Sequence, residues 1–343
     1  MTQPSLPIID ISAFLQPASS AEARQKVANS VNRACVDYGF FYLTGHGLPI
    51  SKLEQIISLA RDFFALPVEE KNKIKRYDAG GPEGGDGARG YQGIGENVTG
   101  GKKDHHEAID LYREWDHDAR RDGRGGPGTS ETLQGTNLWP SQPEELKDVY
   151  LEYIDKLKHI GTALVHAMGA GLDLGPPNEA ASDDTEDELV FVRNTNKSFW
   201  VMRLIGYPQL STPLADNNEA SCGEHTDYGC VTLLLADSTP GALQVLLKDD
   251  KTWLNADPIP GAFVVNIGDM IERWTNGKWR STRHRVLHRG HGFRVSVPFF
   301  FEPNFNAVVK PLRKCVEETS KVPVHQGGTY GEHLLGKVFS NFY

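Results

Sequence analysis

Three stretches in the first half of the chain repeat apolar residues every three or four positions, the period of an amphipathic α-helix. The first is stopped by Gly39, the second ends near Leu66, and the third is closed by the glycine- and proline-rich stretch 169–177. Each stretch predicts a helix that buries one face. The positions that set the period are Val27, Val31, Ala34, Cys35 and Tyr38 in the first stretch, Leu53, Ile56, Ile57, Ala60, Phe63 and Phe64 in the second, and Leu146, Val149, Tyr150, Tyr153, Leu157, Ile160, Leu164 and Met168 in the third.

The second half of the chain changes to short apolar runs separated by turns, which is the pattern of β-strands. Two earlier strands are predicted at 7–14 and 40–44, and residues 332–343 predict an amphipathic C-terminal helix. Many short strands at this spacing indicate an antiparallel barrel or a jelly roll. The runs that predict strands in the second half are 199–207, 230–237, 242–247, 262–268 and 293–301.

The segments between these elements suggest how the chain is organised. Residues 78–101 are rich in glycine, yet they lack the third glycine of the dinucleotide fingerprint and any Gly-Lys-Ser/Thr, so we expect a flexible loop or lid. The acidic segment 178–188 separates the helical half from the strand-rich half. We predict one integrated domain in three parts, namely an N-terminal helical or mixed region packed on the barrel (1–190), a jelly-roll core (191–305), and a C-terminal tail with a helix (306–343).

The amino-acid composition and net charge limit the kinds of partner that the protein is expected to bind. The 343 residues are 39% hydrophobic and 24% charged with a formal net charge of -9, which argues against nucleic acid or an anionic membrane surface as the main partner. The four cysteines form no Cys-x-x-Cys pair, as expected in a reducing compartment. The sequence shows no secretory signal and no apolar run that could span a membrane, so we expect a cytoplasmic monomer.

The first chemical feature lies just before the run 230–237. His225 and Asp227 are two positions apart, so on an extended strand both side chains would share one face. A carboxylate at the edge of an apolar core needs a partner, and a metal ion is one candidate. Two imidazoles and one carboxylate form the facial triad of non-haem Fe(II) oxygenases. A third ligand could come from His284, His288 or His291.

The second feature is a set of polar side chains predicted to face the barrel interior. Arg294 and Ser296 share one face of the strand 293–301, and a guanidinium there binds a carboxylate best, through two parallel hydrogen bonds. Arg203 and Tyr207 share a face of the strand 199–207 by the same alternation. A barrel that holds a metal, an arginine and a tyrosine hydroxyl would suit a small chelating dicarboxylate.

With these residues in place, the chain resembles the iron- and 2-oxoglutarate-dependent dioxygenases, in the branch that includes isopenicillin N synthase. The resemblance rests on "PIIDISAF" and "VNRACVDYGFFYLTGHGLP" in the first half, and on "HTD", "STRHRV" and "RVSVPFFFEPNF" in the second. It implies a mostly β fold with flanking helices, a double-stranded β-helix (jelly roll), and the use of Fe(II), 2-oxoglutarate and dioxygen. The implied reaction is hydroxylation, desaturation or ring closure of a small organic substrate, with release of succinate and carbon dioxide.

The resemblance also implies roles for single residues. His284 is preferred as the third metal ligand because its "HRV" context and its position ten residues before Arg294 match the family. Ile205 departs from the pattern, since many plant members have asparagine there. The implied sites are His225, Asp227 and His284 for the metal, Arg294, Ser296 and Tyr207 for 2-oxoglutarate, and Arg203 and Phe300 for the substrate pocket. Apart from the resemblance, Tyr91 and Asn97 in the glycine-rich segment are further candidates for the substrate pocket.

Several alternatives stay open at this point. An oxidase that works without 2-oxoglutarate, an ethylene-forming fragmentation of 2-oxoglutarate, and a non-catalytic binding protein would all keep the same motifs. His105, His106 and Glu107 look like metal ligands, but adjacent residues on an extended segment face opposite ways, so at most one of them is expected to touch substrate. We expect His288 and His291 to be exposed hairpin residues.

Overall fold

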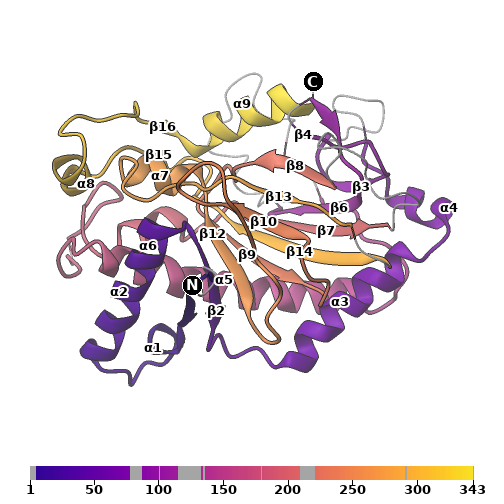
Figure 1. Ribbon diagram of the computed structural model, residues 1–343, viewed down its shortest axis with the longest axis horizontal. Helices are drawn as coiled ribbons and strands as arrows, with labels where there is room; N and C mark the ends of the chain where they lie inside the picture. Colours follow the sequence, from indigo (N-terminus) through magenta and orange to yellow (C-terminus); the bar gives the residue numbers. More distant parts are fainter. Residues whose placement is uncertain are drawn as a thin grey trace.

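The computed structural model describes residues 5–77, 87–99, 101–114, 133, 136–178, 180–208, 221–289 and 292–342. Two β-sheets form the centre of the molecule, and helices from the N-terminal half cover the outer face of the larger one (Figure 1). Strands far apart in sequence alternate within each sheet. This arrangement is the predicted jelly roll with an N-terminal helical region.

The larger sheet has eight strands in the order β1-β2-β12-β9-β14-β7-β6-β3. Its neighbouring strands pair antiparallel, apart from the parallel pair β1 and β2. The strands are β1 (Ile8–Asp10), β2 (Phe40–Thr44), β12 (Phe263–Ile267), β9 (Val231–Ala236), β14 (Arg294–Phe301), β7 (Val201–Tyr207), β6 (Glu107–Tyr112) and β3 (Gly90–Gln92).

The smaller sheet has four antiparallel strands in the order β11-β10-β13-β8. Only β10 was predicted from the sequence, because the other three strands are three or four residues long and carry no alternating apolar pattern. The strands are β11 (Trp253–Asn255), β10 (Leu243–Leu246), β13 (His284–Val286) and β8 (Cys222–His225).

The N-terminal region contributes directly to the larger sheet. The strands β1, β2, β3 and β6 all precede residue 113. β2 pairs with β12 and β6 pairs with β7, while β1 and β3 extend the sheet at its two edges. Residues 1–190 therefore complete the barrel as well as packing on it, and the proposed three-part division of the chain stays a prediction. The helical face of this region is built from the predicted helices α2 (Ala21–Asp37), α3 (Ile50–Phe64) and α5 (Leu146–Gly171).

Two apolar clusters hold these layers together. The outer cluster lies between the larger sheet and the helices, where Phe63 of α3 and Leu157 of α5 are fully buried with Phe299 of β14. The inner cluster lies between the two sheets and contains Phe40, Val245 and other strand residues. Burial of such side chains contributes about 1.5–3 kcal/mol each. The inner cluster extends to Val286 of β13, with Cys222 of β8 packed against it.

Part of the glycine-rich segment is ordered into strands rather than a loop. Gly90–Gln92 form β3, and the hairpin of β4 (Val98–Thr99) and β5 (Lys102–Lys103) follows, while 78–86 and 100 lie outside the described residues. The remaining elements are α1 (Ser12–Leu15), α4 (Val68–Lys71), the 3-10 helix Asn72–Ile74, α6 (Val190–Thr195), α7 (Asp269–Trp274), β15 (Val308–Val309), α8 (Arg313–Glu318), β16 (Gly328–Thr329) and α9 (Tyr330–Phe342). Within the described part of the chain, no helix is both long and apolar enough to cross a membrane.

Candidate active site

Two histidines and one aspartate meet at the edge of the smaller sheet. His225 is the last residue of β8 and pairs across the sheet with His284, the first residue of β13. Their ring centres lie 4.3 Å apart. Asp227 lies beyond β8, in the turn that leads to β9, so the expectation that His225 and Asp227 share a strand face is wrong. The chain instead bends after β8 and brings the side chains of His225 and Asp227 together.

Backbone carbonyls set the orientation of both imidazoles. Nδ1 of His225 lies 2.7 Å from the carbonyl oxygen of Gly223, and Nδ1 of His284 lies 3.1 Å from that of Thr282. In a neutral ring whose Nδ1 donates to a carbonyl oxygen, Nε2 keeps its lone pair. The two Nε2 atoms lie 3.8 and 3.7 Å from the same oxygen, Oδ1 of Asp227. This tautomer is the one that presents both rings to a metal ion.

The other oxygen of Asp227 is held by neighbouring strands. Nδ2 of Asn266 on β12 donates to Oδ2 at 2.6 Å, and the hydroxyl of Thr232 on β9 donates to the same atom. Burial alone would raise the pKa of Asp227, but the adjacent His284 and His225 and these hydrogen bonds lower it. The carboxylate therefore stays ionised with Oδ1 directed at the histidines. Asn266 and Thr232 were missed because their run gave only a strand pattern.

These three side chains have the composition and spacing of a metal site. One ligand atom from each of His225, Asp227 and His284 lies within 4.8 Å of the others, and His284 and Asp227 are buried. Burial lowers the pKa of His284 to about 4, so its imidazole is neutral, the form that binds metals. Two imidazoles and a carboxylate on one side of an ion fit Fe(II) and leave further positions open.

A second polar group lies inside the barrel on β14 and β7. Arg294 is only 2% exposed, and its guanidinium lies 4.7 Å from the ring centre of Tyr207, its partner in the antiparallel pairing. Ser296 shares a hydrogen bond with Tyr207. Nε and Nη1 of Arg294 have no hydrogen-bond partner among the described residues. A buried guanidinium with orphaned donors is a site for an anion, and a carboxylate fits it best.

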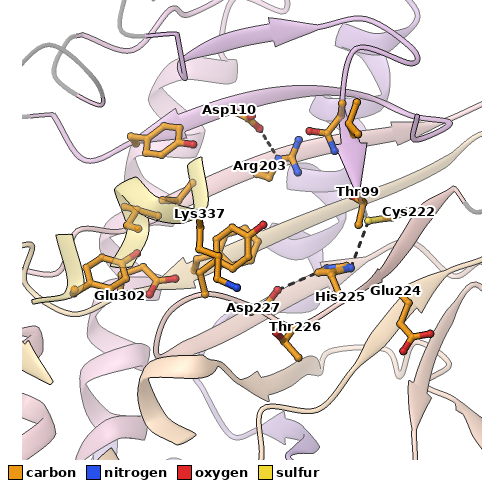
Figure 2. Close-up of a pocket in the computed structure, with 18 residues that line it drawn as sticks. Thr99, Asp110, Arg203, Cys222, Glu224, His225, Thr226, Asp227, Glu302 and Lys337 are labelled. Carbon is orange, nitrogen blue, oxygen red and sulfur yellow. Dashed lines mark hydrogen bonds and ion pairs between the residues drawn. The ribbon is translucent and has the colours of Figure 1, made fainter. Parts of the chain in front are cut away.

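A cavity of about 390 Å³ opens beside the candidate metal ligands (Figure 2). Its wall includes His225 and Asp227, together with Asn97, Arg203 and Phe300, three of the four residues predicted for the substrate pocket. The prediction for the fourth residue, Tyr91, has to be corrected, because Tyr91 is buried and is not part of the cavity wall. Its hydroxyl donates to Oε2 of Glu107 at 2.7 Å.

Arg203 enters the cavity wall from β7 and is held by Asp110 on β6. Nε of Arg203 donates to Oδ1 of Asp110 at 2.6 Å, and Gln92 donates to the other oxygen at 2.6 Å. Burial would lower the pKa of Arg203, but the adjacent Asp110 carboxylate raises it, so the guanidinium stays charged. Nη2 of Arg203 has no hydrogen-bond partner among the described residues. This nitrogen is available to a ligand oxygen.

The other histidine candidates are accounted for by structural contacts. His106 is buried with Nδ1 at 2.8 Å from the carbonyl oxygen of Ser221, whereas His105 is exposed, so the two do face opposite ways. Glu107 forms a buried ion pair with Lys71 at 2.6 Å. His288 is buried rather than exposed, because the segment after β13 folds inward and its Nε2 lies 2.9 Å from the carbonyl oxygen of Gly292. His291 lies outside the described residues.

Sequence reasoning also missed Glu302, a buried carboxyl in the cavity wall. It follows β14 and is 4% exposed. The backbone N–H of Cys230 donates to Oε2 at 3.0 Å, and Tyr330 of α9 shares a hydrogen bond with the carboxyl. The position was quoted in "RVSVPFFFEPNF" without being given a role. A glutamate that interrupts a core strand was the signal that could have found it.

Comparisons with known proteins agree with this geometry. Residues 6–142 match the family described as non-haem dioxygenase in morphine synthesis N-terminal, and residues 196–303 match the 2OG-Fe(II) oxygenase superfamily. Homoarginine-6-hydroxylases from Arabidopsis thaliana and Glycine max are 40% and 39% identical to this chain. The alignments cover 98% of this chain and 98% and 97% of those proteins. The chain belongs to the Fe(II)- and 2-oxoglutarate-dependent dioxygenase family.

A solved structure supports the assignment of this dioxygenase. A full-length Neurospora crassa protein, determined with alpha-KG and 5-formyluracil, superposes with a TM-score of 0.76 at 25% identity, over 97% of this chain and 95% of that one. The predicted reaction class is thereby confirmed: the protein is an enzyme that oxidises a small organic substrate. Fe(II) is its metal, and 2-oxoglutarate and dioxygen are its co-substrates.

Proposed function

We propose that this dioxygenase hydroxylates an amino acid that carries a guanidinium group. The observation that carries the proposal is the 40% identity over 98% of the chain to a protein named homoarginine-6-hydroxylase. The cavity wall adds support, since it contains three carboxyl side chains besides Asp227, namely Asp110, Glu224 and Glu302. A volume of about 390 Å³ lies within the range that holds a small organic molecule.

We assign the metal site to His225, Asp227 and His284, on the distances and tautomers described above. Arg294 and Ser296, with Tyr207 beside them, would hold the far carboxylate of 2-oxoglutarate, and the orphaned nitrogens of Arg294 support this role. Bound Fe(II) and 2-oxoglutarate supply the oxidising chemistry, with succinate and carbon dioxide as the other products. The apolar residues around the cavity limit access of water to the reacting atoms.

We assign substrate contacts to Arg203, Phe300 and Asn97. Phe300 supplies an apolar surface for the methylene chain of an amino acid, and Nη2 of Arg203 can donate to a carboxylate. Asn97 is fixed at the cavity wall because its Nδ2 donates to Oδ2 of Asp104 at 2.6 Å. These residues orient the substrate, and none of them needs to exchange a proton with it.

A substrate assay with matched neutral analogues tests the proposal. The enzyme with Fe(II), 2-oxoglutarate and dioxygen is supplied with homoarginine, arginine, lysine, or homocitrulline, the neutral isostere of homoarginine. We expect succinate release and a product heavier by one oxygen with a guanidino amino acid, and little of either with homocitrulline. Hydroxylation of the carbon bonded to the guanidino nitrogen would give a carbinolamine, which releases free guanidine. If no guanidino compound stimulates succinate release, the proposed substrate class is refuted.

The same reaction mixtures distinguish hydroxylation from the two alternative reactions of the family. Ethylene in the headspace would indicate fragmentation of 2-oxoglutarate, and product formation without succinate would indicate an oxidase that does not need it. We expect neither, because hydroxylases named for their substrate align over nearly the whole chain.

We further propose that the enzyme is a cytoplasmic monomer with a role in secondary metabolism. Cys35, Cys222, Cys230 and Cys315 are all free thiols, which supports a reducing compartment. Light scattering after size exclusion tests the oligomeric state, and fractionation of the source cells tests the location.

A further inference from the structure

We propose that Glu302 receives the guanidinium of the substrate, so that the cationic end of the molecule lies at the metal site. This inference rests on the proposed function and deepens it, because it names the residue that selects a positively charged substrate. The argument uses the charges of the cavity wall, the way Glu302 is held, and the position of its carboxyl relative to Asp227.

The carboxyl groups of the cavity wall differ in what already neutralises them. Asp110 accepts from Nε of Arg203 at 2.6 Å, and Glu224 forms an exposed ion pair with Arg283 at 2.8 Å. Glu302 has no ion pair with a basic side chain among the described residues. Lys337, the lysine of the cavity wall, is directed elsewhere, with Nζ 5.2 Å from the ring centre of Tyr228. Glu302 is therefore the carboxyl still able to take a cation.

The surrounding chain is shaped to hold this carboxyl. A Cβ at Gly229 would lie 1.1 Å from Oε2 of Glu302, so position 229 has to be glycine for the carboxyl to fit. The N–H of Cys230 and the hydroxyl of Tyr330 then fix its orientation from two sides. Three separate elements thus position one acidic group at a cavity wall, which is costly for an apolar barrel unless the group has a partner.

The electrostatic environment of Glu302 also supports a cationic ligand. The pKa of Glu302 is raised to about 8, mainly by burial, and the nearby carboxylates Asp227 and Asp269 contribute in the same direction. These are the properties of a carboxyl that lacks its counter-ion, and a guanidinium, which stays protonated at any physiological pH, supplies one through two parallel hydrogen bonds. Without a cation beside it, Glu302 keeps its proton at neutral pH, whereas a guanidinium would stabilise the ionised carboxylate.

The position of Glu302 also fixes which end of the substrate is oxidised. Its carboxyl accepts from Cys230, in the same turn that carries Asp227. Figure 2 shows Glu302 and Arg203 in different parts of the cavity wall, with Arg203 beside Asp110. A guanidinium at Glu302 therefore places the neighbouring methylene near the metal. The carboxylate end of the substrate is then directed toward Nη2 of Arg203.

A binding experiment on the complete enzyme tests the inference. The complex with Fe(II) and 2-oxoglutarate is titrated without oxygen with homoarginine and with homocitrulline, in the unsubstituted enzyme, Glu302→Gln, Glu302→Asp and Glu317→Gln. We expect the Kd for homoarginine to rise between about 10- and 100-fold in Glu302→Gln, while the Kd for homocitrulline changes little. The Kd of Glu302→Asp for homoarginine should lie between those of the unsubstituted enzyme and Glu302→Gln. Glu317→Gln, the control at an exposed glutamate outside the cavity wall, should keep the original preference.

Each outcome decides a separate point. Iron content, 2-oxoglutarate affinity and circular dichroism establish that the Gln and Asp variants are folded and loaded. If the unsubstituted enzyme prefers homoarginine and Glu302→Gln keeps the full preference, Glu302 is not the cation site, although the proposed function stands. If the unsubstituted enzyme itself has no preference for the charged ligand, the proposed function fails, and the inference fails with it. If only Glu302→Gln loses the preference for homoarginine over homocitrulline, the result supports both the inference and the proposed function.

Discussion

Asn266 holds Asp227 by a hydrogen bond of 2.6 Å from Nδ2 to Oδ2, and this leaves the other carboxylate oxygen facing His225 and His284. The amide lies on β12, far from both histidines in sequence, and is 3% exposed. A carboxylate that is held by one oxygen can present the second in a fixed direction. Asn266 therefore positions a metal ligand without being one.

Replacing Asn266 by alanine should weaken iron binding about 10- to 100-fold, because groups that orient metal ligands usually contribute that much. The measurement is a competition titration with a metal chelator, read as bound iron at each chelator concentration. Asn255→Ala, an exposed amide on β11, is the matched control and should bind iron normally. Unchanged iron affinity in Asn266→Ala would show that Asp227 needs no such support.

Alanine at His225, Asp227 or His284 should abolish stoichiometric iron binding and turnover, because each removes one of three converging ligand atoms. His288→Ala is the informative control, since His288 was an alternative third ligand and its Nε2 instead lies 2.9 Å from Gly292 O. Metal analysis of the purified variants checks this. The ligand set would have to be revised if His284→Ala kept its iron or His288→Ala lost it.

Arg294→Lys should raise the concentration of 2-oxoglutarate needed for half-maximal rate by at least about 10-fold, while iron stays bound. Lysine keeps the positive charge but cannot form two parallel hydrogen bonds with a carboxylate. The measurement is the rate against 2-oxoglutarate concentration, together with iron content. Arg285→Lys, on the outer side of β13 with its guanidinium 3.9 Å from the ring centre of Trp253, should behave normally. Normal kinetics for Arg294→Lys would contradict the proposed role.

Glu302 should make the iron-free protein less stable as the pH rises. Its pKa is 4.5 in the unfolded chain and about 8 in the folded protein, so between these values the folded protein keeps a proton that the unfolded chain has released. The free energy of unfolding then falls with pH, by at most about 1.4 kcal/mol per pH unit, and the fall ends above pH 8. Glu302→Gln lacks this dependence.

Urea unfolding of both iron-free proteins at pH 5, 6.5 and 8 measures the effect. We expect the stability of Glu302→Gln relative to the unsubstituted protein to increase across this series. A difference that is the same at all three pH values would show that the carboxyl is ionised in the folded protein throughout.

Local patterns were sufficient for the long elements and for the motif residues. The helices α2, α3 and α5 were predicted because each repeats apolar residues over about three or more turns, and β9 and β14 because they are short, mostly apolar runs. The strands β8 and β13 were not predicted, since their few residues gain stability from pairing with each other and with β10 rather than from their own composition. Tyr91 was misplaced because the sequence does not show that Lys71 and Glu107 occupy the space beside it.

The amino-acid sequence by itself determined which chemical groups this enzyme has: two histidines and an aspartate for a metal, and an arginine with a serine for a carboxylate. Only the tertiary structure decided how they are supported and charged. Asn266 and Glu302 matter because of what lies next to them in space, on strands and turns distant along the chain. Burial and nearby charge set hydrogen bonding and protonation, and both depend on neighbours that no local pattern can identify.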